Sequence, residues 1–303
     1  MKEIRNDFYN ESIFKETLDN GLTVYLMPKK GYSQYSAIFM TNYGSFDTTF
    51  TPIDEDRFIK TPEGIAHFLE HKMFETPSGG DVNDLFSNIG VEANAYTSYD
   101  RTAYTIFGTG NANEAVELLI DFVQTPYFTD ENIEKEKPII EQEIRMYLDK
   151  ASTSLYNHLL QNMYEKNNVR HDIGGTLESI YDINKDILYK CYNTFYHPSN
   201  MTLTIIGNFD KERVMKMIEE NQKEEGTSDI KDVLPYLYCD SPAGKAYIKW
   251  MHLAMEYAFE NRHRMMTDVK QCVKETLEKF LRHIIRTLGI IAKEIALVDN
   301  QGM

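Results

Sequence analysis

The run His67-Phe-Leu-Glu-His71 constrains this chain more than any other feature of its sequence. On a helix, His67 and His71 lie one turn apart on the same face, and Glu70 lies on that side as well. Neutral imidazole nitrogens suit zinc, and a catalytic zinc site keeps one open position for water. A carboxylate beside that water can act as its general base. The spacing therefore predicts a zinc site with Glu70 as the base, while two histidines on a solvated helix face remain the alternative.

The order His-x-x-Glu-His is the reverse of the commoner His-Glu-x-x-His metallopeptidase motif. A second helix, expected over residues 131–148, carries Glu136 and Glu143, which lie seven residues and therefore two turns apart on one face. Either carboxylate can reach a metal held by the histidines. A charged stripe on a solvated helix is the alternative, because this segment is rich in lysine and glutamate. Pro138 lies inside the pattern and is expected to kink or divide the helix.

The composition narrows the class of protein. The 303-residue chain carries a formal net charge of -15, which argues against broad binding to nucleic acids or anionic membranes. Its three cysteines, Cys191, Cys239 and Cys272, form no C-x-x-C pair, a pattern typical of a reducing compartment. Residues 1–16 lack the apolar core of a signal peptide, and no apolar run is long enough to span a bilayer. We expect a soluble cytoplasmic protein that binds neither nucleic acid nor membrane.

Hydrophobic periodicity predicts an α+β fold in which helices pack on a mostly antiparallel sheet. Two alternating strands, 22–27 and 35–40, are expected to form a hairpin that leads into the histidine helix, itself expected from about Pro62 to Phe74. The other segments are expected as a hairpin of 91–99 with 104–107, as helices at 82–89, 113–123, 131–148, 154–163, 183–192 and 211–220, and as a strand at 201–206.

Several longer motifs surround the histidine run, and together they span roughly residues 15–215. They are Gly64–Phe74, Asn94–Tyr104, Pro126–Phe128, Glu134–Tyr147 and Phe195–Met201. In combination they resemble the pitrilysin–insulinase family of zinc metallopeptidases, and most closely its small bacterial members.

This resemblance implies a zinc-dependent endopeptidase and assigns its site residue by residue. His67 and His71 match two zinc ligands of the family, and Glu143 matches the third. Glu70 matches the base that activates water for attack on a peptide bond. Glu136 matches an acidic residue seven positions before the third ligand, which we expect to orient one of the ligands.

The resemblance also predicts where a peptide substrate binds. Asn94 and Ala95 match a sheet edge that receives the substrate as an added strand, a mode in which backbone hydrogen bonds supply the affinity. The alternative is that Asn94 only shapes a hairpin. Glu141 is the alternative third zinc ligand.

The matching segments cover only the first half of a protein that usually closes two homologous halves around a peptide. A homo- or heterodimeric partner is therefore expected to supply the second half, whose Arg–Tyr pair cannot be placed in this sequence. The alternative function is a catalytically incomplete half that binds peptide or a partner subunit.

The chain is expected to divide into three parts. Residues 1–220 form the zinc peptidase domain, residues 221–240 form a charged linker, and residues 241–303 form a helical tail. The tail is slightly basic, whereas the rest of the chain is strongly acidic. From about residue 241 it is similar to a helical piece of the tRNA-splicing RNA ligase family, although the metal and guanylate motifs of that family are missing.

Overall fold

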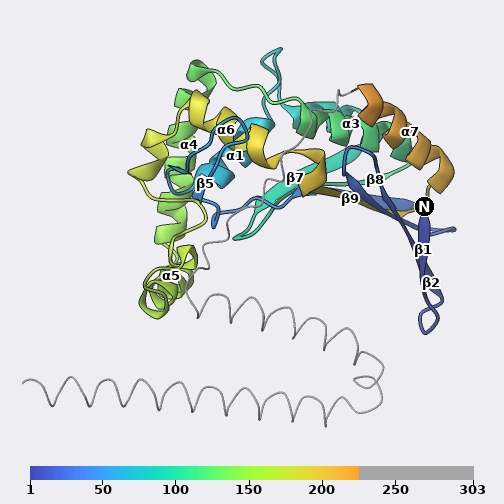
Figure 1. Ribbon diagram of the computed structural model, residues 1–303, viewed down its shortest axis with the longest axis horizontal. Coiled ribbons are helices and arrows are strands. Elements are labelled where there is room, and N and C mark those ends of the chain that lie inside the picture. Colours follow the sequence, from blue (N-terminus) through green and yellow to red (C-terminus); the bar gives the residue numbers. More distant parts are fainter. Residues whose placement is uncertain (225–303) are drawn as a thin grey trace, which may run out of the picture. The chain divides into compact units, whose positions relative to one another are not determined.

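A computed structural model describes residues 1–224, which build a seven-stranded sheet with helices packed on it (Figure 1). All neighbouring strands are antiparallel except β3 and β9, which run parallel. The α+β class, with a mostly antiparallel sheet, is confirmed. In spatial order the strands are β1 (Lys2–Asn6), β2 (Glu11–Thr17), β3 (Thr23–Pro28), β9 (Met201–Gly207), β4 (Gln34–Thr41), β8 (Thr102–Thr109) and β7 (Val91–Thr97).

The expected hairpin of segments 22–27 and 35–40 is wrong, because β9 lies between the corresponding strands, β3 and β4. Leu203 of β9 pairs with Val24 on one side and with Phe39 on the other. All three side chains are fully buried, and β9 is the central strand of the seven. A parallel neighbour requires a long crossover, and here the crossover from β3 to β9 contains most of the chain.

The polar N-terminal segment forms an additional hairpin that the sequence reasoning missed. Strands β1 and β2 pair from Lys2↔Lys15 to Asn6↔Glu11 and extend the sheet beyond β3. Most side chains of β1 are exposed. Without a buried face the strand has no strict apolar alternation, which is the signal by which strands are recognised in a sequence.

Seven α-helices are present among residues 1–224, and they lie close to their expected positions. Helix α3 packs on β8 and β4 and contacts α7, while α1 contacts α4, α6 and β7 (Figure 1). A short strand pair, β5 (Thr49–Phe50) with β6 (Ile59–Lys60), lies apart from the main sheet. The helices are α1 (Ile65–Met73), α2 (Val82–Asn88), α3 (Ala112–Gln124), α4 (Asp130–Leu148), α5 (Ala151–Met163), α6 (Lys185–Phe195) and α7 (Lys211–Glu224).

Helix α1 begins at Ile65, three residues later than expected from Pro62. Gly64 precedes it with a φ of 84°, in the left-handed region that favours glycine. A Cβ atom on Gly64 would lie 2.4 Å from the carbonyl oxygen of Gly174. Only glycine satisfies both the backbone angle and this close contact, so the start of the histidine helix is fixed by its neighbour at 174.

Helix α4 continues through Pro138, so the alternative that this residue divides the helix is wrong, while the alternative that it kinks the helix stays a prediction. Proline removes one backbone N–H, which leaves the carbonyl of Glu134 without its partner four residues on. Both Glu134 and Pro138 lie on the exposed side of the helix, where water can bind that carbonyl. The helix starts with a capping box between Thr129 and Asn132, which stabilises its first turn.

One apolar core lies between the sheet and the helices and positions the histidine helix. The buried side of α1 contributes Ile65, Phe68, Leu69 and Met73, as expected from its periodicity. Among the described helices, none has the length and apolar character needed to cross a membrane. The first residues of the expected linker, 221–224, belong to α7, and the rest of that linker lies outside the described residues. The expected helical tail lies outside the described residues, and the proposed division of the chain stays a prediction.

Candidate metal centre

The two histidines of α1 lie on the side of the helix opposite its buried apolar residues. Their Nε2 atoms face each other at 3.2 Å. On the apolar side, the fully buried side chains of Phe68 and Leu69 pack in the core and hold the helix in place. The rotation of α1 is therefore set by packing, and the imidazoles project towards α4 as a consequence.

Glu143 reaches the same point from α4, which contacts α1. Its Oε2 atom lies 3.4 Å from Nε2 of His71 and 3.7 Å from Nε2 of His67. Two ligand atoms that each bind zinc at about 2.0–2.1 Å with tetrahedral angles lie about 3.3 Å apart. The three atoms match that spacing, and they form a group that can hold a metal ion. The donor set, two nitrogens and one carboxylate oxygen, also suits catalytic zinc.

Glu136 lies behind His71 on the same face of α4. Its Oε1 atom is 3.0 Å from Nδ1 of His71, so the ring N–H donates to this carboxylate and Nε2 stays directed at Glu143. Lys72 approaches the other carboxylate oxygen at 3.6 Å and also pairs with Glu75. Its side chain is 2% exposed. Sequence reasoning missed this buried lysine, whose only signal was its place beside the motif.

The charges around the two rings give them different protonation behaviour. Burial and the neighbouring positive charge of His71 lower the pKa of His67 to about 4. Burial also disfavours a charged His71, but the carboxylates of Glu136 and Glu143 outweigh it and raise the pKa of His71 to about 9. The hydrogen bond to His71 holds the pKa of Glu143 below its usual range. Without a metal ion, His67 is therefore neutral at pH 7, whereas His71 is protonated and its positive charge is balanced by the two carboxylates.

Glu70 lies on the same turn of α1 and is 7% exposed. Its Oε2 atom accepts a hydrogen bond of 2.6 Å from the hydroxyl of Thr97, the last residue of β7. Burial raises the pKa of Glu70, while the bond from Thr97 opposes that shift. Sequence reasoning did not single out Thr97, because a threonine at a strand end carries no chemical signal by itself.

A loop after α5 closes the site on the side of His67. Gly174 packs near Nδ1 of His67, and Asp172 accepts the backbone N–H of Gly174 at 2.9 Å. The Nδ1 atom is buried and has no hydrogen-bond partner within the part of the chain that the structure describes. The other nitrogen of this ring is the one that faces Glu143.

The residues predicted to bind substrate lie on an outer strand of the sheet. Asn94 and Ala95 belong to β7, which pairs with β8 and ends the strand order. The backbone N–H of Ala95 donates to the side-chain oxygen of Asn94 at 2.8 Å. Glu141, the alternative ligand, instead pairs with Arg145 and Tyr181 on the other side of α4 and is not part of the metal-binding group.

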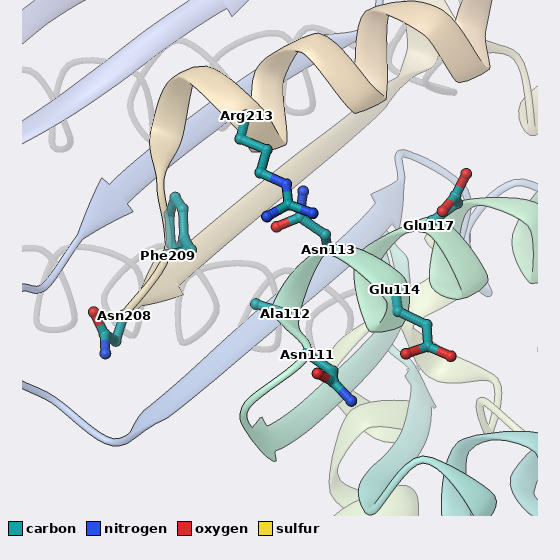
Figure 2. A pocket seen from close by; sticks show the side chains of 8 residues that line it. All are labelled: Asn111, Ala112, Asn113, Glu114, Glu117, Asn208, Phe209 and Arg213. Carbon is teal, nitrogen blue, oxygen red and sulfur yellow. The ribbon is translucent and has the colours of Figure 1, made fainter.

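A separate cavity of about 470 Å³ lies where α3 begins and β9 passes into α7 (Figure 2). In Figure 2 the guanidinium of Arg213 points towards Asn113. None of the predicted site residues lines this cavity, which sets it apart from the histidine pair. Its lining is Asn111, Ala112, Asn113, Glu114, Glu117, Asn208, Phe209 and Arg213.

Comparison with known protein families identifies two segments of this chain. Residues 60–177, which include the histidine run and Glu143, match the insulinase family, peptidase family M16. Residues 182–250 match the inactive domain of peptidase M16. The similarity of the tail to an RNA ligase is not borne out, since the peptidase match itself continues past residue 241.

Individual relatives agree with this assignment. The chain is 48% identical over 233 residues to an uncharacterized zinc protease, YmfH of Bacillus subtilis, covering 77% of this chain and 54% of that protein. The crystal structure of a putative M16-like peptidase from Alicyclobacillus acidocaldarius matches with a TM-score of 0.69 and 47% identity, over 72% of this chain and 51% of that one. Pitrilysin shares the fold with a TM-score of 0.61 at 20% identity, over 76% of this chain and 26% of that one.

The fold, the metal-binding group and these matches agree on a single class, the M16 peptidases. The chain belongs to the insulinase/pitrilysin family, M16, and its relatives are named zinc proteases. It spans about half the length of YmfH and of the Alicyclobacillus peptidase.

Proposed function

We propose that this chain binds one zinc ion through His67, His71 and Glu143 and hydrolyses peptides as a zinc-dependent endopeptidase. The observation that carries the proposal is the convergence of three ligand atoms from two helices beside a buried glutamate. Zinc, when bound, polarises the scissile carbonyl and lowers the pKa of the attacking water.

Glu70 is the residue that moves the proton. It takes a proton from the attacking water and returns it to the leaving amine. Burial supports this role, because a raised pKa brings a carboxyl closer to the range in which it both accepts and donates protons. Glu136 holds the ring of His71 in the tautomer whose Nε2 atom can bind a metal.

The outer edge of β7 is the proposed binding site for the substrate backbone. Added-strand binding requires free backbone groups on an edge strand, and β7 is the last strand of the sheet. The side chain of Asn94 now accepts the N–H of Ala95, so it would exchange this bond for one to the substrate. Such binding favours extended peptides over folded proteins.

The chain spans only about half the length of YmfH and of the Alicyclobacillus peptidase, so peptide cleavage can depend on a second half. We propose that a second M16 half completes the chamber around the peptide. A catalytically incomplete half that binds peptide or that partner is the second candidate, supported by the same coverage. A cytoplasmic location stays a prediction.

Cleavage of a library of quenched fluorescent peptides, with and without a chelator, tests the proposal. The zinc-loaded chain should cut peptides, the chelator should abolish cutting, and Glu70→Gln should lower the rate by about 10²-fold or more while zinc stays bound. Each assay is run alone and with a candidate second half. If the zinc-loaded protein binds peptide but cleaves none, either alone or with the second half, the endopeptidase proposal is wrong and the second candidate, a catalytically incomplete peptide-binding half, replaces it.

A further inference from the structure

We propose that Thr97 is a positioning residue that holds the carboxylate of Glu70, so that β7 sets the base as well as the substrate edge. The inference rests on the proposed function, because it concerns the residue assigned there as the base. It adds a contact between strand and helix that neither the motif nor the family match assigns.

The contact itself is short and largely removed from water. The hydroxyl of Thr97 donates to Oε2 of Glu70 at 2.6 Å, a typical distance for a hydrogen bond from a hydroxyl to a carboxylate. Glu70 is 7% exposed and Thr97 is half-buried. A hydrogen bond from a neutral donor to a charged acceptor in such surroundings contributes more than one at the surface.

The direction of the hydrogen bond follows from the acceptor, because an ionised carboxylate can only accept, and the neighbouring hydroxyl does not compete for this role. Thr102 pairs with Thr97 across β7 and β8, and it is fully buried. Its hydroxyl donates to the backbone carbonyl of Tyr43 at 2.9 Å and lies 3.4 Å from that of Thr97. Thr102 therefore does not donate to Thr97, and of the two oxygens near the Thr97 hydroxyl the carboxylate of Glu70 is the closer, at 2.6 Å against 3.4 Å.

The position of Thr97 joins two parts of the site. Glu70 lies on α1 with both histidines, whereas Thr97 lies two residues after Ala95 and on the same face of β7. Helix α1 and strand β7 are in contact. The bond therefore fixes the base relative to the edge on which the scissile peptide is proposed to lie, and a peptide shifted on β7 would be misplaced relative to Glu70.

Kinetics on three threonine variants separate positioning from simple packing. Thr97→Val, which keeps the shape but removes the hydroxyl, should lower kcat by about 10- to 100-fold, the loss expected for a hydrogen bond to a charged group. KM and zinc content should change little, because Thr97 touches no proposed ligand. Thr97→Ser should restore most of kcat. Thr204→Val, a half-buried threonine on β9 away from Glu70, is the matched control and should behave as wild type.

A second readout works without any peptidase activity. In zinc-free protein, the loss of Tm caused by Thr97→Val should be smaller in a Glu70→Ala background than in wild type, because the partner is already gone. Thr97→Ala gives the same comparison with a smaller side chain. Additive effects in this cycle, or kcat of Thr97→Val equal to that of Thr204→Val, would overturn the inference. A wild-type chain that cuts nothing removes the proposed function, and the cycle still decides the contact.

Discussion

Nδ1 of His71 lies 3.0 Å from Oε1 of Glu136, while Nε2 of the same ring points at Glu143 from 3.4 Å. The two glutamates lie two turns apart on α4 and contact opposite nitrogens of one imidazole. One helix therefore supplies both a candidate metal ligand and the group that orients another. The spacing of seven residues places both glutamates on the same face of α4, where both can contact His71.

Removing the carboxylate behind His71 should weaken metal binding without removing a ligand. Glu136→Gln is expected to lower zinc affinity by about 10- to 100-fold, because the ring loses the partner that fixes its tautomer. Competition with a fluorescent chelator measures the affinity. Glu131→Gln, an exposed glutamate on the same helix, is the control. Equal affinity for Glu136→Gln and wild type would contradict the assigned role.

The two candidate third ligands can be separated by paired substitutions. Glu143→Gln should reduce zinc affinity by more than about 100-fold, beyond the usual effect of a residue that only supports a ligand. Glu141→Gln should leave it unchanged, since Glu141 pairs with Arg145 and Tyr181. Metal analysis after dialysis against a weak chelator reports the difference. The reverse order of effects would make Glu141 the ligand.

The glycine before the histidine helix should be intolerant of any side chain. Gly79→Ala, at a φ of 78° with open space around it, is expected to cost about 1–2 kcal/mol through backbone strain alone. Gly64→Ala adds a clash with the Gly174 carbonyl and should lower Tm further. Thermal unfolding of both variants, with zinc content measured alongside, checks this. Equal losses of Tm in the two variants would show that the backbone around residue 174 moves to accommodate a side chain at position 64.

A half-buried aspartate outside the metal site, Asp47, should make stability depend on pH. Burial, aided by the charge of Asp100 and opposed by the N–H of Gly44, raises the pKa of Asp47 to about 7. The unfolded residue titrates near pH 4, so folding binds a proton between about pH 4 and 7. The contribution of Asp47 to the free energy of unfolding is therefore fully present below about pH 4 and is lost as the pH rises to about 7.

Asp47→Asn imitates the protonated form, so its advantage over wild type should grow with pH. We expect the Tm difference between Asp47→Asn and wild type to increase from pH 4.5 to pH 7 and to level off at pH 8. Both proteins are compared at the same zinc saturation, so that metal-linked protons cancel. A Tm difference that is the same at pH 4.5 and pH 8 would rule out a raised pKa for Asp47.

The sequence predicted the structure best where the evidence lies within a single helix. The histidine spacing and the apolar positions of α1 follow from a period of 3.6 residues, which needs no knowledge of the rest of the chain. The order of the strands could not be predicted in this way. The alternation of apolar and polar residues in β3 and β4 is the same whether the two strands are neighbours or lie on either side of β9. Their true neighbours are decided by burial across more than 150 residues of sequence.

Two site contacts escaped prediction for a related reason. Lys72 is buried between Glu75 and Glu136, yet a lysine in a polar motif is ordinarily expected at the surface. Thr97 matters only because α1 packs on β7 and brings Glu70 to its hydroxyl. Both depend on contacts between elements, which residue type and spacing do not encode.

Anomalous X-ray scattering at the zinc edge, from crystals of the zinc-loaded chain, decides whether the two histidines and Glu143 bind the ion. We expect one strong peak per chain, within about 2.0–2.2 Å of His67 Nε2, His71 Nε2 and a Glu143 oxygen. Data from both sides of the edge identify the element. A zinc peak bound elsewhere, or zinc-loaded protein whose Glu143 points away from the histidines, would contradict it.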